Sequence, residues 1–256
     1  MKISANLGFL WTGLDLPGAV RAAGRAGFDA VECHFPFGED PGAVRAALEE
    51  TGLPMLGLNT VRGDLAAGEF GLAACPARYD AARAAIDQAI SYGAAIGAKN
   101  VHVMAGKADG GHARATFIEH LAYAADRAGE AGIGILIEPI NTRDVPGYHL
   151  SLVEDGAEII SALGRGNIRL MLDCYHTQIM QGDLTRRIEA HLDVIGHLQI
   201  AAVPSRAEPD TGEIAYDRLI PAVQALGYDG YWGAEYRPTG TTEEGLGWLG
   251  QLRSLG

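Results

Sequence analysis

The chain has 256 residues, of which 48% are hydrophobic and 20% are charged, and its formal net charge at pH 7 is −12. This composition indicates a globular protein with one large α/β domain or two small ones, and the acidic balance argues against a protein that grips nucleic-acid phosphates. Three cysteines without CxxC spacing, no signal-peptide pattern and no apolar run of membrane-spanning length predict a cytoplasmic protein with no membrane partner.

Eight short apolar segments have the length and composition of β-strands. They lie at residues 2–10, 29–35, 53–59, 100–104, 133–138, 168–173, 197–200 and 230–235. Segments with helical spacing alternate with them, at residues 15–26, 41–51, 77–97, 113–131, 155–163, 177–190, 217–226 and 242–252. The longest irregular stretch, residues 60–76, follows the third strand, and loops of that length in compact domains are often functional lids.

Strict alternation of strands and helices predicts a parallel sheet. Eight such units in this length predict a closed (β/α)8 TIM barrel, and the lack of a linker or composition shift predicts a single domain over residues 1–256. An open, doubly wound sheet is the alternative. The sequence has no GxGxxG motif after the first strand, which disfavours a dinucleotide-binding version of that fold.

Each of the last four predicted strands carries a side chain that can bind a metal ion at or near its carboxyl end. These side chains are Glu138, Asp173, Gln199 and Glu235. In a barrel the four strand ends are neighbours on one rim, where three carboxylates would repel one another unless a cation bound them. Oxygen-rich ligation suits Mg²⁺ or Mn²⁺ better than Zn²⁺. The alternative is that some of these acids are helix N-caps or surface ion pairs.

The ordered set of motifs resembles the hydroxypyruvate isomerase family, within the xylose isomerase-like TIM barrel superfamily. The motifs are ANL at 5–7, NT at 59–60 with GD at 63–64, GLA at 71–73, IEPINTRDVPG at 137–147, DCYH at 173–176, QIMQGD at 178–183, GHLQI at 196–200, EPDTGEI at 208–214, GYDG at 227–230 and EY at 235–236. The resemblance implies that Glu138, Asp173, Gln199 and Glu235 bind the metal, and that Glu138 and Glu235 are the paired acid and base. It also implies an isomerase that interconverts hydroxypyruvate and tartronate semialdehyde, or a close oxo-acid such as 2-oxo-tetronate, through an enediolate.

Four further residues are candidates for substrate binding. His176 lies in the loop after the sixth strand and is expected to hydrogen-bond a substrate oxygen. Arg206 follows the seventh strand and is expected to bind a substrate carboxylate, for which the planar guanidinium is suited. Lys107 is a weaker candidate for the same carboxylate, and Glu208 is expected either to contact substrate or to hold Arg206.

Three positions depart from the sequence that is usual in this family, and two histidines have no assigned role. Ala202, Ser205 and Ala207 stand where the family usually carries Asp, Gly and His, so the departure concerns substrate contacts rather than the reaction type. His102, inside the fourth strand, is as consistent with a core residue as with a site residue, and His34 is interpreted as structural.

Three other functions share this kind of barrel. A ketose 3-epimerase uses similar carboxylates on a free sugar, but such enzymes typically carry His where Gln199 stands. A metal-dependent apurinic endonuclease would need further His ligands and a basic surface, and an inactive barrel would have lost Glu138 or Glu235. The partner expected here is therefore a small-molecule substrate. Family members commonly self-associate, so the resemblance also implies a homo-oligomer.

Overall fold

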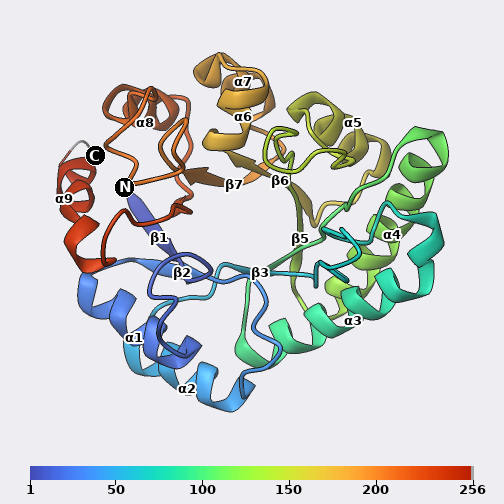
Figure 1. The fold of residues 1–256 in the computed structure, drawn as a ribbon, viewed down its shortest axis with the longest axis horizontal. Helices are drawn as coiled ribbons and strands as arrows, with labels where there is room; N and C mark the ends of the chain where they lie inside the picture. Colours follow the sequence, from blue (N-terminus) through green and yellow to red (C-terminus); the bar gives the residue numbers. More distant parts are fainter. Residues whose placement is uncertain (255–256) are drawn as a thin grey trace.

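The fold is a ring of eight parallel strands surrounded by helices (Figure 1). The computed structural model describes residues 1–254, and within it the strands follow the order β2-β1-β8-β7-β6-β5-β4-β3. Their bounds are β1 (Lys2–Asn6), β2 (Ala30–Glu32), β3 (Gly57–Asn59), β4 (Asn100–His102), β5 (Gly134–Ile137), β6 (Ile168–Asp173), β7 (Ile195–Ile200) and β8 (Tyr231–Ala234). The predicted TIM barrel is confirmed.

The barrel closes between β2 and β3, the first and last strands in this order. The Val31 N–H donates to Pro54 O (3.0 Å), and Val31 O accepts from the Leu56 N–H (2.7 Å). The Cys33 N–H donates to Gly57 O (3.0 Å). Each strand therefore has a neighbour on both sides, and the carboxyl ends of all eight lie on one rim.

Helices form the outer layer of the barrel. Their bounds are α1 (Leu16–Ala26), α2 (Pro41–Thr51), α3 (Tyr79–Ile96), α4 (Gly110–Glu130), α5 (Val153–Leu163), α6 (Cys174–Met180), α7 (Leu184–His191), α8 (Tyr216–Ala225) and α9 (Gly247–Arg253), with 3-10 turns η1 (Pro76–Arg78) and η2 (Glu243–Gly245). Asp15 caps α1 by accepting a hydrogen bond from the Gly18 N–H (2.8 Å). The last helix, α9, lies beside α1 and completes the ring (Figure 1).

Several predicted elements differ from the observed ones in their bounds, and the helix predicted over residues 242–252 is the turn η2 followed by α9. Two of the differences have a clear local cause. The first strand ends at Asn6 rather than at residue 10, because the Asn6 side chain accepts from the Gly8 N–H (2.9 Å) and begins a turn. The single helix predicted over residues 177–190 is two helices, α6 and α7. Gly182 (φ 64°) and Asp183 (φ 50°) between them adopt left-handed backbone conformations that a helix cannot contain.

The hydrophobic core lies mainly between the barrel and its helices. Side chains such as Ile3, Ile135 and Ile137 are completely buried there. The barrel also buries polar side chains, described below, which cluster toward the carboxyl ends of the strands. Across residues 1–254, no helix combines the length and hydrophobicity needed to cross a membrane.

Candidate active site

The alternation of side chains along β5 aims Glu138 into the barrel. Ile137 lies in van der Waals range of the position that a Cβ on Gly156 of α5 would occupy, so Ile137 points outward. Leu136 lines a small cavity inside the barrel, and Glu138 continues the inward set. Pro139 has no N–H for a ladder, and the strand ends at Ile137, directly before the carboxylate.

The other three predicted ligands reach the same interior from neighbouring strands. Asp173 of β6 pairs in register with Gln199 of β7, which pairs with Gly233 of β8. Glu235 lies two residues beyond Gly233 and therefore projects from the same face. Glu138, Asp173, Gln199 and Glu235 are all buried, with 0–7% of each residue exposed.

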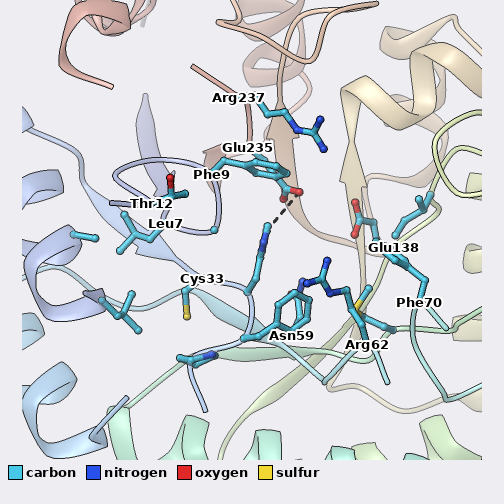
Figure 2. A pocket seen from close by; sticks show the side chains of 18 of the residues that line it. Leu7, Phe9, Thr12, Cys33, Asn59, Arg62, Phe70, Glu138, Glu235 and Arg237 are labelled. Carbon is cyan, nitrogen blue, oxygen red and sulfur yellow. Dashed lines mark ion pairs between the residues drawn. The ribbon is translucent and has the colours of Figure 1, made fainter. Parts of the chain in front are cut away.

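A pocket of about 500 Å³ opens over this rim. Of the predicted site residues, Glu138, Glu235, His176 and Arg206 line it. Figure 2 shows the carboxylates of Glu138 and Glu235 facing the same open space. Asp173 and Gln199 lie beside the pocket, in contact with its lining residues.

Arg206 joins two of the acids. Its Nη2 donates to Glu235 Oε1 (2.7 Å) and lies 3.4 Å from Asp173 Oδ2. The guanidinium is flanked by two rings, with its central carbon 5.0 Å from the Phe9 centroid and 4.9 Å from the Tyr175 centroid. Arg206 thus lines the pocket, and its charge is directed at the acids, while its binding of a substrate carboxylate stays a prediction.

The pKa values of the three buried acids differ widely, because the single positive charge of Arg206 cannot neutralise all three carboxylates. Burial raises the pKa of Glu138 well above its usual range, and the charges of Glu235 and Asp173 raise it further. Burial also raises the pKa of Asp173 to about 7, against the lowering effect of Arg206. Burial acts upward on Glu235 as well, but its side-chain interaction with His34 and the charge of Arg206 lower its pKa to about 2.

His176 is held as a neutral hydrogen-bond donor. Its Nδ1 accepts from the Asn141 N–H (3.3 Å), which leaves the ring proton on Nε2. Burial and the charge of Arg206 lower the pKa of His176 to about 3. Nε2 lies 3.7 Å from Glu138 Oε1 and 3.7 Å from Asp173 Oδ2. A protonated Nε2 can donate to a substrate oxygen but cannot bind a metal.

The donor set fits a hard divalent cation. Buried Glu138 Oε1 and Gln199 Oε1 have no hydrogen-bond partner among the described residues. Gln199 uses its Nε2 to donate to Glu235 Oε2 and to Glu32 Oε1 (3.1 Å), so its unpaired oxygen remains available. Carboxylate and amide oxygens are the ligands that Mg²⁺ and Mn²⁺ prefer.

Two predicted substrate residues do not line this pocket. Lys107 is exposed and lies outside the pocket lining, and its backbone forms a bridge with Tyr148. Glu208 is buried, but its Oε1 accepts from the Thr239 N–H (2.9 Å) and hydroxyl (3.3 Å). Within residues 1–254 no ion pair joins Glu208 to Arg206, so the expectation that Glu208 holds Arg206 is wrong.

A buried polar network beneath the predicted ligands was missed by sequence reasoning. Glu32 Oε1 accepts from Asn6 Nδ2 (3.1 Å) and from Gln199 Nε2, and Glu32 Oε2 lies 2.6 Å from His197 Nε2. Asn6 Nδ2 also donates to Glu235 Oε2 (2.9 Å). Asn6 and Glu32 end β1 and β2, but the strands predicted there extend to residues 10 and 35, so a search of predicted strand ends passes over both.

Three more pocket residues were not predicted as site residues. His34 was interpreted as structural, but it lines the pocket, with Nε2 3.7 Å from Glu235 Oε1. Arg62 and Arg237 line the pocket from the loops after β3 and β8. Loop arginines carry no periodic sequence signal that would mark them. His102 is buried, with Nδ1 3.6 Å from Glu138 Oε2, which places it beside the site.

A family model described as xylose isomerase-like TIM barrel matches residues 20–252. The chain belongs to this family. The 2-oxo-tetronate isomerase of Cupriavidus necator is 44% identical over 252 residues, which are 97% of each chain. The hydroxypyruvate isomerase of Escherichia coli is 38% identical over 99% of this chain and 100% of its own. A solved structure described as AP endonuclease, family 2, from Brucella melitensis is 38% identical, with a TM-score of 0.92 and 98% of each chain covered.

These relatives confirm the predicted resemblance to the hydroxypyruvate isomerase family, and the protein is an isomerase of this family. The description of the Brucella structure matches the endonuclease alternative. Among the described residues, however, one group of three His, Cys, Asp or Glu side chains has its ligand atoms within 4.8 Å, namely Glu138, Asp173 and His176. That group and a net charge of −12 do not fit a several-histidine zinc cluster on a DNA-binding face.

Proposed function

We propose that this isomerase interconverts hydroxypyruvate and tartronate semialdehyde, or a close oxo-acid such as 2-oxo-tetronate. The observation that carries the proposal is the pair of buried carboxylates, Glu138 and Glu235, that face one pocket from β5 and β8. The names of the two isomerase relatives support the substrate class.

Proton transfer between adjacent carbons suits this pair. One carboxylate removes a proton from the hydroxymethyl carbon of hydroxypyruvate, and the C–H electrons move to form the enediolate double bond. A proton is then delivered to the former carbonyl carbon, while the hydroxyl proton of the first carbon passes to the oxygen of the former carbonyl. The first carbon thereby becomes the aldehyde of tartronate semialdehyde. Carboxylates on opposite sides of a planar enediolate can divide the acid and base roles. His176 Nε2–H donates to a substrate oxygen as negative charge develops on it.

The proposal includes a divalent metal, Mg²⁺ or Mn²⁺, held by Glu138, Asp173, Gln199 and Glu235. Such an ion polarises substrate oxygens and offsets enediolate charge when it is bound. The unpaired oxygens of Glu138 and Gln199 support this ligand set. Arg206 supplies positive charge to Asp173 and Glu235 from the pocket side and lies where it can also meet a substrate oxygen.

Solvent-deuterium incorporation followed by NMR tests the proposal. The panel is hydroxypyruvate, a 2-oxo-tetronate and the free ketose fructose, each with Mg²⁺, with Mn²⁺ or with a chelator. We expect exchange and conversion in an oxo-acid, dependent on the added metal. Exchange in fructose alone would replace the proposal with a ketose epimerase, and full activity in chelator would remove the metal from it. The homo-oligomer and the cytoplasmic location stay predictions.

A further inference from the structure

The proposed substrates carry a carboxylate that must be bound in a pocket already crowded with acids. The cation predicted for it, Arg206, is engaged with Glu235 and Asp173, and Lys107 lies outside the pocket. Two other arginines, Arg62 and Arg237, line the pocket and form no ion pair with any described residue. These two are the pocket arginines whose charge is not already directed at an acid.

Arg62 is the more firmly held of the two. Its guanidinium carbon lies 4.5 Å from the centroid of Phe35 and 5.7 Å from that of Phe70. Phe70 in turn packs edge-on against buried Tyr148, with ring centroids 6.4 Å apart. Stacking on aromatic faces leaves the edge N–H groups of a guanidinium free for a bidentate pair with a carboxylate. Arg237 is more exposed, and its guanidinium carbon lies 5.6 Å from the centroid of Phe9.

The loop that carries Arg62 is fixed to the barrel. Arg62 O accepts from the Gly71 N–H (2.8 Å), and Gly71 bridges to Ala105 just beyond β4. The Thr60 N–H donates to His102 O (2.9 Å) at the start of the same loop. Gly71 has φ 108° and leaves no room for a side chain, because an added Cβ would lie 2.7 Å from Gly106 N. The backbone of residues 60–76 is therefore fixed to the barrel by hydrogen bonds, and this fixes the position of Arg62.

The direction of Arg62 also suits the role. In Figure 2 its guanidinium points toward the space in front of Glu138 and Glu235, from the side opposite Arg237. A short oxo-acid with its carboxylate at Arg62 would place its neighbouring carbons toward these two acids. Pairing at Arg62 would also balance the substrate's charge against the acids beyond it.

We propose that Arg62 is the substrate-carboxylate receptor and sets the preference of this pocket for acidic substrates. The inference rests on the proposed function for the identity of the substrate, but not for the binding of a carboxylate. The matched test uses Arg62→Met, which keeps an unbranched stem between Phe35 and Phe70, and Arg62→Lys, which keeps charge without the planar fork. Arg237→Met is the control.

The readouts are KM and kcat for hydroxypyruvate, and calorimetric binding of D-glycerate and its neutral amide, with circular dichroism to verify folding. We expect Arg62→Met to raise KM roughly 10- to 150-fold, the range for losing a hydrogen-bonded charge pair, while kcat stays within about threefold. The same variant should erase the preference for glycerate over the amide, Arg62→Lys should restore part of it, and Arg237→Met should keep it.

The outcomes separate this inference from the proposed function. If wild-type protein binds glycerate through Arg62 but exchanges deuterium into neither oxo-acid, the receptor assignment stands and the proposed reaction fails. Unchanged glycerate preference in folded Arg62→Met would overturn the assignment. So would an acid-selective loss that follows Arg237→Met instead.

Discussion

Replacing Glu32 should weaken metal binding although Glu32 is not among the proposed ligands. Glu32 Oε1 accepts from Gln199 Nε2, which keeps the amide nitrogen turned away and leaves Gln199 Oε1 unpaired. Glu32→Ala removes one of the two acceptors of Gln199 Nε2, the other being Glu235 Oε2. The amide is then held less firmly and can turn, which would present a donor to the cation. Outer partners of metal ligands typically contribute 10- to 100-fold in affinity, about 1.4 to 2.7 kcal/mol. We therefore expect Mn²⁺ affinity to fall by that factor.

The assay is Mn²⁺ titration by calorimetry or electron paramagnetic resonance, with Glu32→Gln as the matched control. The glutamine can still accept from Gln199, so its affinity should stay within a few-fold of wild type. Glu32→Ala also leaves His197 Nε2 without its buried carboxylate partner and removes one of the two acceptors of Asn6 Nδ2, at a cost of about 3 kcal/mol in the free energy of unfolding. A folded Glu32→Ala protein that binds Mn²⁺ as wild type does would refute the reasoning.

Three further predictions test the site and its support. Glu138→Gln and Glu235→Gln should each lower deuterium exchange by about 10²- to 10⁴-fold with unchanged circular dichroism, and turnover like wild type would remove that residue from the mechanism. Because burial raises the pKa of Glu138 and brings that of Asp173 to about 7, protons compete with the metal. Calorimetry should show Mg²⁺ affinity falling from pH 8 to pH 6, whereas a flat profile would contradict that coupling. Gly71→Ala should lower the free energy of unfolding by about 1–3 kcal/mol in urea denaturation, because a φ of 108° and the 2.7 Å distance from an added Cβ to Gly106 N disfavour a side chain. An unchanged urea midpoint would show that the loop accommodates the side chain without strain.

The fold followed from local signals that do not depend on distant contacts. Aliphatic runs bounded by glycine and proline mark the strands, and their alternation with helices leaves few topologies other than a barrel. The break between α6 and α7 at Gly182 and Asp183 could not be predicted from the sequence, because the segments on both sides have helical spacing. Only the left-handed backbone conformation of these two residues separates the helices.

The candidate site was predictable in part. Glu138 and Asp173 were visible because an acid that follows a buried aliphatic run is unusual. Glu32 follows only two apolar residues in β2, Ala30 and Val31, so the contrast there is weak. The position of Arg62 depends on the contact of its loop with the end of β4, far along the chain. No local sequence pattern encodes such a contact. The position of Lys107 was unpredictable for a similar reason, because its backbone pairs with Tyr148, about 40 residues along the chain.

The two halves of the barrel supply different things to the pocket. Glu138, Asp173, Gln199 and Glu235 come from β5 to β8, whereas Phe35, Arg62 and Phe70 come from loops after β2 and β3. Apart from His34, which contacts Glu235, changes in the first-half loops can therefore alter which molecules fit without moving the groups that transfer the proton. A mutant library confined to residues 35–37 and 61–70 would therefore vary the substrate-contacting loops. The proposed proton-transfer and metal-binding residues of β5 to β8 would stay unchanged.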